Sequence, residues 1–373
     1  MSYDPQECLA FSLIKGMNAR AALEIVDNLG DLHEFFRLDL KDAKKLPNAG
    51  DLLIEVLKER KTALAKAKEE LRYIKKNNIQ VHCIFDKDNY PYRLEQCADA
   101  PVCFFSLGNC NLDDERMLAV VGTRRCTAYG QSYTGQIIEE IREGVGSATI
   151  VSGLAYGIDK AAHEAALRLG MPTVGVLAHG LSMIYPAQHR GLAASIVRKG
   201  GMLITEYLHA AQPFRNHFLE RNRIIAGLCD AVFVAESPLR GGALNTAAHA
   251  RNYDREVLAL PGRATDEASA GCNSLISRQL AVLATSAKDV AIGAGWKYSN
   301  EKADPLPQQE SLFDVYSGNT KVIYDYLRSQ TDPVTVDKMV KTTGLSTKEV
   351  MSSIGELDMD GILKRHPGAK YFL

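Results

Sequence analysis

The chain has 373 residues, of which 46% are hydrophobic and 24% charged, and these values predict a globular protein of more than one domain. No apolar run is long enough to cross a membrane, and no basic segment followed by an apolar one opens the chain, so we expect a cytoplasmic protein without membrane contact. The eight cysteines are scattered, without C-x-x-C or histidine clusters, which argues against a disulfide scaffold or a zinc site and predicts reduced thiols.

The net charge of −1 conceals an uneven distribution of charge along the chain. Residues 116–263 hold 16 of the 44 Lys and Arg but only 11 of the 45 Asp and Glu, so this middle region is basic and the remainder acidic. All but two of the 16 cations are arginines, whose planar guanidinium groups suit phosphate and stack on bases. The middle region is therefore predicted to bind a polyanion, although a solvated basic face would have the same composition.

Residues 1–76 carry apolar residues at helical spacing in three segments, 7–14, 19–30 and 50–76. Short breakers at Lys15–Asn18 and Leu46–Gly50 separate these segments. The alternation is typical of helix-hairpin-helix (SAM-like) domains, in which backbone N–H groups of the hairpin hold a DNA phosphate. A plain helical packing module would explain the pattern equally well.

Residues 77–293 form the predicted core, in which strands and helices alternate. Apolar runs predict strands at 79–85, 102–108, 117–122, 148–153, 173–178, 202–207, 231–236 and 256–262. Helical spacing predicts helices at 130–144, 157–170, 189–201, 220–228 and 242–254. Continuous apolar strands with intervening helices indicate the α/β class, as a Rossmann-like, doubly wound, mostly parallel sheet. Ligands of such a sheet bind in the loops at the carboxyl ends of its strands.

Residues 294–318 are polar and contain Pro305 and Pro307, which predicts a linker. Residues 319–373 then show three short helices and a two-stranded ribbon, the layout of a winged helix. Its last helix, near residues 346–360, has four acidic residues and one lysine, a composition that suits the major groove poorly. We therefore favour a regulatory or protein-binding role for this domain over duplex recognition.

The loop after the strand at 117–122 reads Gly122-Thr123-Arg124-Arg125 and leads into a helix. The glycine lets the backbone approach a ligand, the arginines suit phosphate, and the helix offers its positive end to an anion. No G-x-G-x-x-G or P-loop motif is present, and no acidic residue ends the next strand to bind a ribose. We therefore expect a phosphate ligand here, but no dinucleotide or other cofactor.

The next loop contains Ser152, Gly153 and Gly157 ahead of a helix. Glycines suit a tight turn and close helix–sheet packing, and this structural explanation is the stronger one. Asp159 and His163, four residues apart, are predicted to face each other in a structural hydrogen bond rather than a catalytic pair. Ser152 lacks the G-x-S-x-G elbow of a nucleophile.

Residues 213–228 combine arginines with aromatic side chains, as in a groove for single-stranded nucleic acid. The arginines of this stretch are Arg215, Arg221 and Arg223. The alternative is an ion pair of one arginine with Glu206 or Glu236 and burial of the rings in the core. For Phe214 we favour burial in the core. For Phe218, burial and base stacking explain the ring equally well.

The loop after the strand at 231–236 places Arg240, Gly241 and Gly242 ahead of a helix, with Thr246 in its first turn. This is a further glycine-rich anion cradle. Four such loops at one edge of the sheet predict one extended polyanion-binding surface.

The stretches VVGTRRCTAYG, IVSGLAYGIDKAAHEAAL, YPAQHRGLAASIV, LITEY, RNRIIAGL, GGALNTAAHA and PGR…GCNSLI resemble, in order and spacing, the DNA-processing protein A (DprA/Smf) family over about residues 80–290. The resemblance implies a non-enzymatic mediator that binds and protects incoming single-stranded DNA, forms a homodimer, and loads RecA recombinase during natural transformation. The family's cation three positions before an aromatic matches Arg215 and Phe218, where the cation is usually lysine. The resemblance places the phosphate pocket at Gly122, Thr123 and Arg124, with Arg125 adjacent. From the loops and the resemblance together, the predicted DNA-binding residues are Gly122, Thr123, Arg124, Arg125, Ser152, Gly153, Gly157, Arg215, Phe218, Arg221, Asn222, Arg223, Arg240, Gly241, Gly242 and Thr246.

The alternative is a Rossmann-fold enzyme of the phosphoribohydrolase type, whose motif is P-G-G-x-G-T-x-x-E. Here the stretch RGGALNTAAH is one residue longer between Gly242 and Thr246, and His249 takes the place of the glutamate. Without that carboxylate the acid–base chemistry lacks an obvious carrier. The DNA-binding protein is therefore the favoured prediction.

Overall fold

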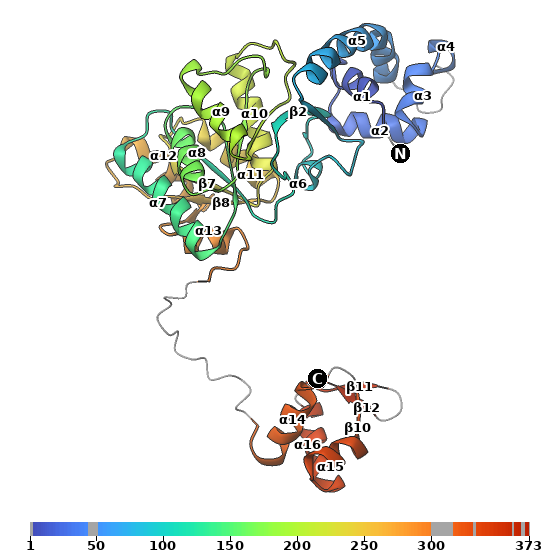
Figure 1. The fold of residues 1–373 in the computed structure, drawn as a ribbon, viewed down its shortest axis with the longest axis vertical. Coiled ribbons are helices and arrows are strands. Elements are labelled where there is room, and N and C mark those ends of the chain that lie inside the picture. The colour runs from blue at the N-terminus through green and yellow to red at the C-terminus, as the bar shows by residue number, and fades with distance from the viewer. Residues whose placement is uncertain are drawn as a thin grey trace. The chain divides into compact units, whose positions relative to one another are not determined.

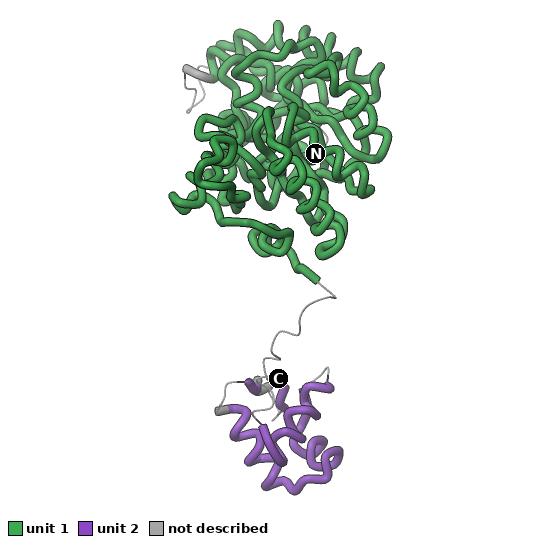
Figure 2. The backbone as a smooth tube through the Cα atoms, turned by 90° about the vertical axis from the view of Figure 1, so that its left-hand side faces the viewer, with its two compact units in different colours: residues 1–300 green, residues 301–373 purple. Residues whose placement is uncertain are grey.

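The computed structural model describes residues 3–43, 51–299, 316–330, 333–359, 362–366 and 370–372. The chain forms two compact units, residues 1–300 and 301–373 (Figure 2). Among the described residues, no helix is long and apolar enough to cross a membrane. Within the same described ranges, no group of three or more His, Cys, Asp and Glu is placed to hold a metal ion.

In the described residues, the first unit begins with the helices α1 Pro5–Ser12, α2 Ala19–Leu29, α3 Leu32–Arg37, α4 Leu40–Ala43 and α5 Asp51–Lys76 (Figure 1). The predicted first hairpin lies between α1 and α2, but the N–H of Lys15 donates to the Glu59 carboxylate at 3.1 Å. A carboxylate at this hairpin disfavours a DNA phosphate there. The second predicted hairpin, Leu46–Gly50, lies outside the described residues. Phe11 packs edge-on against Phe35 and also contacts Phe85, which joins these helices to the core of the sheet.

A nine-stranded sheet follows, with the spatial order β1-β2-β6-β5-β4-β3-β7-β8-β9. Its strands are β1 Gln80–Cys83, β2 Cys103–Gly108, β3 Met117–Gly122, β4 Thr149–Ser152, β5 Thr173–Val176, β6 Met202–Thr205, β7 Ala231–Glu236, β8 Glu256–Ala259 and β9 Val282–Leu283. The pairs formed by β2 are antiparallel, and all pairs from β6 to β9 are parallel. This confirms the predicted Rossmann-like sheet.

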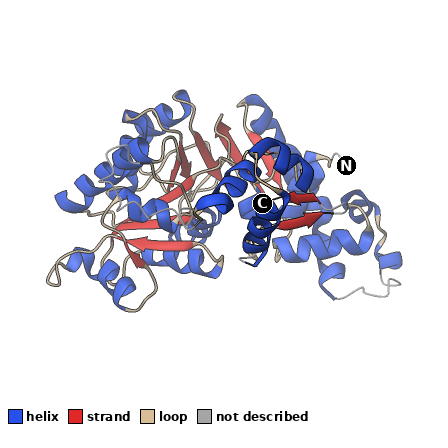
Figure 3. Ribbon diagram, turned by 90° about the horizontal axis from the view of Figure 1, so that it is seen from below, coloured by secondary structure: helices blue, strands red, loops and turns tan. Residues whose placement is uncertain are grey.

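Helices cover both faces of the sheet (Figure 3). These helices are α6 Tyr92–Glu95, α7 Ala128–Gly144, α8 Ile158–Arg168, α9 Arg190–Arg198, α10 Arg215–Gly227, α11 Ala243–Asn252, α12 Ala270–Ser277 and α13 Ala287–Gly293. Successive residues of a strand point to opposite faces. On β3, Leu118 and Val120 accordingly pack in the cluster of α7, α8 and α13, while Ala119 and Val121 pack in that of α10, α11 and α12. Burial on both faces explains why the strand sequences are continuously apolar.

The second unit is a winged helix, as predicted. It contains α14 Gly318–Arg328, β10 Val334–Thr335, α15 Val336–Thr343, α16 Thr347–Met359, β11 Lys364–His366 and β12 Lys370–Phe372, with strand order β10-β12-β11. In the predicted linker, residues 294–299 pack on the first unit, since Trp296 Nε1 donates to Asp230 at 3.1 Å and Ser299 N donates to Gly144 O at 2.7 Å. Residues 300–315 lie outside the described part of the chain.

Candidate nucleic-acid interface

The candidate site lies where the order of the strands reverses. β3 and β7 are neighbours, but the chain continues from β3 to β4 on one side and from β7 to β8 on the other. The helices that follow these two strands, α7 and α11, pack on opposite faces of the sheet. The loops after β3 and β7 therefore diverge and leave a crevice, the usual ligand site of an open α/β sheet.

A cleft of about 760 Å³ occupies this position. We call it the arginine cleft, because Arg124, Arg125, Arg215, Arg221 and Arg240 line it, against a single carboxylate, Asp159, among the described residues of its wall. The other lining residues are Val121, Gly122, Thr123, Ala155, Tyr185, Pro213, Phe218, Leu219, Asn222, Ile225, Pro238, Gly241, Gly242, Ala243 and Thr246. The cleft is therefore strongly basic, with apolar patches between its cations.

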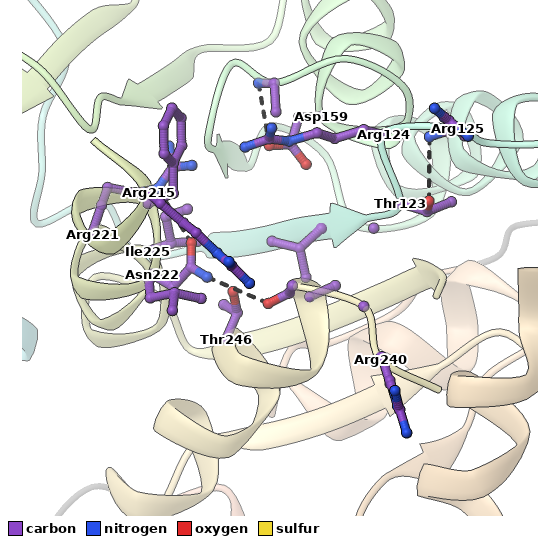
Figure 4. Close-up of a pocket in the computed structure, with 18 of the residues that line it drawn as sticks. Thr123, Arg124, Arg125, Asp159, Arg215, Arg221, Asn222, Ile225, Arg240 and Thr246 are labelled. Carbon is purple, nitrogen blue, oxygen red and sulfur yellow. Dashed lines mark hydrogen bonds between the residues drawn. The ribbon is translucent and has the colours of Figure 1, made fainter. Parts of the chain in front are cut away.

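Arg124 and Phe218 both line the cleft and contact each other. The Arg124 guanidinium carbon lies 4.8 Å from the centroid of the Phe218 ring. The centroid of the Tyr185 ring lies 5.8 Å from that of Phe218. Arg124 and Arg215 are exposed, whereas Phe218 is half-buried. Figure 4 shows Arg124, from the loop after β3, and Arg215, from the start of α10, extending into the same space, while the side chain of Arg240 points away from it. The structure thus places Arg124 over the Phe218 ring, a contact that the sequence did not predict, while Arg215, the cation predicted to accompany Phe218, lines the same cleft.

Arg221 also lines the cleft, but it is buried and serves the fold. Its Nη1 donates to the carbonyl of Gly153 at 2.7 Å and to that of Val176. These contacts tie the ends of β4 and β5 to α10. Burial lowers the pKa of Arg221 to about 10, with Asp159 acting in the opposite direction. A side chain at Gly153 would collide with the Arg221 guanidinium, which explains the glycine without a ligand.

Asp159 and His163 do not form the predicted pair. Asp159 accepts the N–H groups of Gly153 and Ala155, at 3.2 and 3.3 Å, and burial raises its pKa. The Nδ1 of His163 hydrogen-bonds to Thr173 Oγ1 at 2.7 Å, and burial lowers the pKa of His163 to about 3. The i, i+4 spacing was a poor guide because each side chain meets a closer partner from the loop or the next strand.

The positive end of α7, expected to face the ligand, instead binds a carboxylate of the protein. Glu236, buried at the end of β7, accepts from the N–H of Thr127 at 2.7 Å and from its hydroxyl at 2.6 Å. A Cβ on Gly130 would lie 2.7 Å from the same carboxylate. The loop before α7 is also occupied, because the N–H of Thr123 donates to Glu236 O at 2.7 Å and that of Arg125 donates to Thr123 Oγ1 at 3.2 Å. Because a protein carboxylate already holds this helix terminus, the arginine side chains are what the cleft offers a phosphate.

Four residues predicted to contact DNA do not line the cleft: Gly153, which packs against Arg221, and also Ser152, Gly157 and Arg223. Ser152 is fully buried and donates to Val120 O at 2.6 Å. Gly157 has a φ of 75°, and a side chain there would collide with Thr123 O, so it shapes the loop. Arg223 pairs with Glu206 at 2.6 Å, which is the ion pair that the sequence left open.

Several other placements refine the sequence prediction. α10 begins at Arg215 rather than near 220, so Phe214 becomes its N-cap residue and is exposed, not buried in the core as expected. Asn222 donates to Gly242 O at 3.4 Å and to Asn245 Oδ1 at 3.2 Å, and so joins α10 to the loop after β7. Tyr185 was not predicted to bind DNA, although it lies in the YPAQHR stretch that resembles the family.

A Rossmann-like sheet with an arginine-lined crevice at its switch point, joined in the chain to a winged helix, defines a protein of the phosphate- or nucleic-acid-binding class. Comparison with known proteins then gives the family. The family model described as DNA recombination-mediator protein A matches residues 81–294, and the DprA winged helix domain matches residues 317–369. The chain belongs to the DprA family.

Individual relatives support the same family. The DNA processing protein DprA of Streptococcus pneumoniae is 41% identical over 203 residues, which are 54% of this chain and 70% of that protein. The crystal structure of DprA from the same species superposes with a TM-score of 0.65 at 34% identity, covering 78% of this chain and 98% of that one. DNA processing protein A of Helicobacter pylori, whose structure is described for its single-stranded DNA binding mode, has a TM-score of 0.51 at 28% identity and covers 57% and 93%.

Proposed function

We propose that the chain binds single-stranded DNA in the arginine cleft and acts as a recombination mediator without catalysing a reaction. In this proposal, a homodimer in the cytoplasm protects incoming DNA and loads RecA recombinase onto it during natural transformation. The observation that carries the proposal is the Arg124 guanidinium over the Phe218 ring, with exposed Arg215 at the same cleft. Cations for phosphates beside an aromatic face for a base are what a single-strand groove requires.

The phosphoribohydrolase alternative finds less support. His249, in the place of the expected glutamate, lies 3.5 Å from the Tyr253 hydroxyl and does not line the cleft. Asp159, the carboxylate in the cleft wall, is held by two backbone N–H groups. A general acid or base needs reach to a substrate proton, and this carboxylate is already committed to the loop.

The test is fluorescence anisotropy with an unstructured single strand and a matched duplex across a salt series. The wild-type chain should prefer the single strand, and binding should weaken as salt rises. Arg124→Ala and Arg215→Ala should each weaken binding and make the salt slope shallower by about 0.7 per lost phosphate contact.

Arg142→Ala is the matched control, because Arg142 is exposed in the last turn of α7. This turn precedes β4 and so lies at the amino ends of the parallel strands, opposite the cleft. It should bind like wild type. An unchanged slope in Arg124→Ala and Arg215→Ala would remove these residues from the site. Failure of the wild-type chain to bind at low salt would overturn the proposed function.

RecA loading has its own readout. The chain should accelerate RecA ATPase activity on a single strand already coated with a single-strand-binding protein, and Arg124→Ala should lose this effect. A chain that binds the strand but leaves RecA activity unchanged would refute the mediator step and retain DNA binding.

A further inference from the structure

Exposed aromatic side chains gather at one edge of the sheet. Among the described residues, the exposed aromatic rings are Tyr92, Tyr129, Tyr156, Tyr185 and Phe214. Four of them follow β3, β4, β5 and β6 in turn, one in each loop or first helical turn at the carboxyl edge. Folding favours the burial of aromatic rings. Four exposed rings, each after one of four successive strands and at the edge that carries the arginine cleft, therefore indicate a ligand.

Two of these rings, Tyr185 beside Phe218 and Tyr156 in the loop after β4, are held in defined positions. Tyr185 lies in the cleft wall, is 43% exposed, and packs at 5.8 Å from Phe218. Tyr156 is 40% exposed, and its hydroxyl donates to Gln188 Oε1 at 2.7 Å. Rings already fixed by such contacts lose little conformational freedom when a planar ligand stacks on them.

Phe214 is the most exposed of these rings, at 62%, and packs edge-on against His217 at 5.3 Å. His217 in turn stacks on Tyr207 at 4.1 Å, so this ring also rests on a packed base. The next residue along the chain is the exposed cation Arg215.

Cations alternate with these rings. Exposed Arg215 follows Phe214, exposed Arg190 begins α9 after the Tyr185 loop, and Arg124 covers Phe218. Alternating arginines and aromatic rings suit a phosphate chain whose bases stack one after another.

We propose that Tyr156, Tyr185 and Phe214 stack the nucleobases that neighbour the base at Phe218, so that the strand runs along the loops after β4, β5 and β6. This inference rests on the proposed function and adds three residues to it. These strands are neighbours in the order β6-β5-β4 and therefore span roughly 10 Å at about 4.8 Å per step. At about 3.4 Å per step between stacked bases, that length spans about three steps and so takes about four bases, one for each of these rings and one for Phe218.

The test compares two strands of equal length, one with bases and one in which every base is replaced by an abasic spacer. Binding of the full chain is measured by anisotropy, and stacking by quenching of 2-aminopurine in the first strand. Alanine at Tyr156, Tyr185 or Phe214 should weaken binding of the base-bearing strand about fivefold or more, because one stacked base contributes about 1–3 kcal/mol. The abasic strand should bind all variants like wild type, because its phosphates still meet the arginines.

Tyr185→Phe should retain binding, since it keeps the ring. Tyr92→Ala is the matched control, because Tyr92 is 47% exposed but begins α6, between β1 and β2. Equal affinity of the alanine variants and wild type for the base-bearing strand, or equal losses on both strands, would overturn the inference. So would unquenched 2-aminopurine on the saturated wild-type chain, a readout that needs no variant to fold. A wild-type chain that binds neither strand would overturn the proposed function itself.

Discussion

The three arginines of α10 lie within nine residues of each other, yet they meet three different environments. Arg215, the first residue of the helix, is exposed at the cleft. Arg221 is buried and donates to two carbonyl groups, and Arg223 is paired with Glu206. The first can bind a ligand, whereas the other two hold the fold. Side-chain chemistry alone therefore does not identify a phosphate contact, because burial and nearby acceptors decide where a guanidinium is used.

The largest expected effect separates Arg221 from Arg215. Arg221→Ala leaves the carbonyls of Gly153 and Val176 without this donor and should lower the free energy of unfolding by about 3 kcal/mol. Arg215→Ala should change it by less than about 0.5 kcal/mol, because its side chain is exposed. Urea unfolding followed by Trp296, the one tryptophan of the chain and part of the first unit, measures both.

A nearly unchanged free energy in Arg221→Ala would show that its hydrogen bonds are easily replaced. A large loss in Arg215→Ala would show that the start of α10 needs its cation. Either result would refute the conclusion that Arg215 is free to bind a ligand whereas Arg221 stabilises the fold.

A smaller effect is expected for Arg223→Ala, a loss of about 2 kcal/mol of unfolding free energy with an unchanged salt slope for DNA. Burial raises the pKa of Glu206, and Arg223 opposes this rise, so removing Arg223 raises the pKa of Glu206 further. A raised carboxyl pKa means that the folded chain holds the proton more tightly than the unfolded chain. Stability therefore falls as the pH rises above the unfolded value of 4.5.

The loss in Arg223→Ala should accordingly be larger near about pH 7.5 than near about pH 5.5. The double variant with Glu206→Gln should regain part of it, because no unpaired carboxylate remains. A loss that is independent of pH, or a shallower salt slope for DNA, would instead place Arg223 among the ligand contacts.

Much of the fold was predictable because its signals are local. β3 and β7 coincide with the apolar runs at 117–122 and 231–236, since strands buried on both faces are apolar throughout. The glycine- and arginine-rich loops after them could be placed at one edge of the sheet by the rule for parallel strands. Arg124 was predicted in this way, whereas Arg215 and Phe218 were predicted from the mixture of arginines and aromatic residues in 213–228 and from the family resemblance.

The rest depended on contacts between distant residues. The donors of Arg221 meet carbonyls 68 and 45 positions away, and Glu236 caps the start of α7 from 109 positions away. No local pattern marks such partners. Phe214 was predicted to lie in the core, with the helix beginning near residue 220. In the structure the helix begins at Arg215, so Phe214 is its exposed N-cap residue.

The smallest expected effect concerns the loop after β7. Arg240 was predicted to contact DNA and lines the cleft, but its exposed side chain points away from Arg124 and Arg215 (Figure 4). Arg240→Ala should therefore change single-strand affinity by less than about twofold and leave the salt slope unchanged, while Arg124→Ala makes it shallower. Anisotropy with both variants in one salt series compares them directly. If Arg240→Ala also lowers the slope by about 0.7, a phosphate reaches the loop after β7, and the strand crosses the switch point instead of ending at β3.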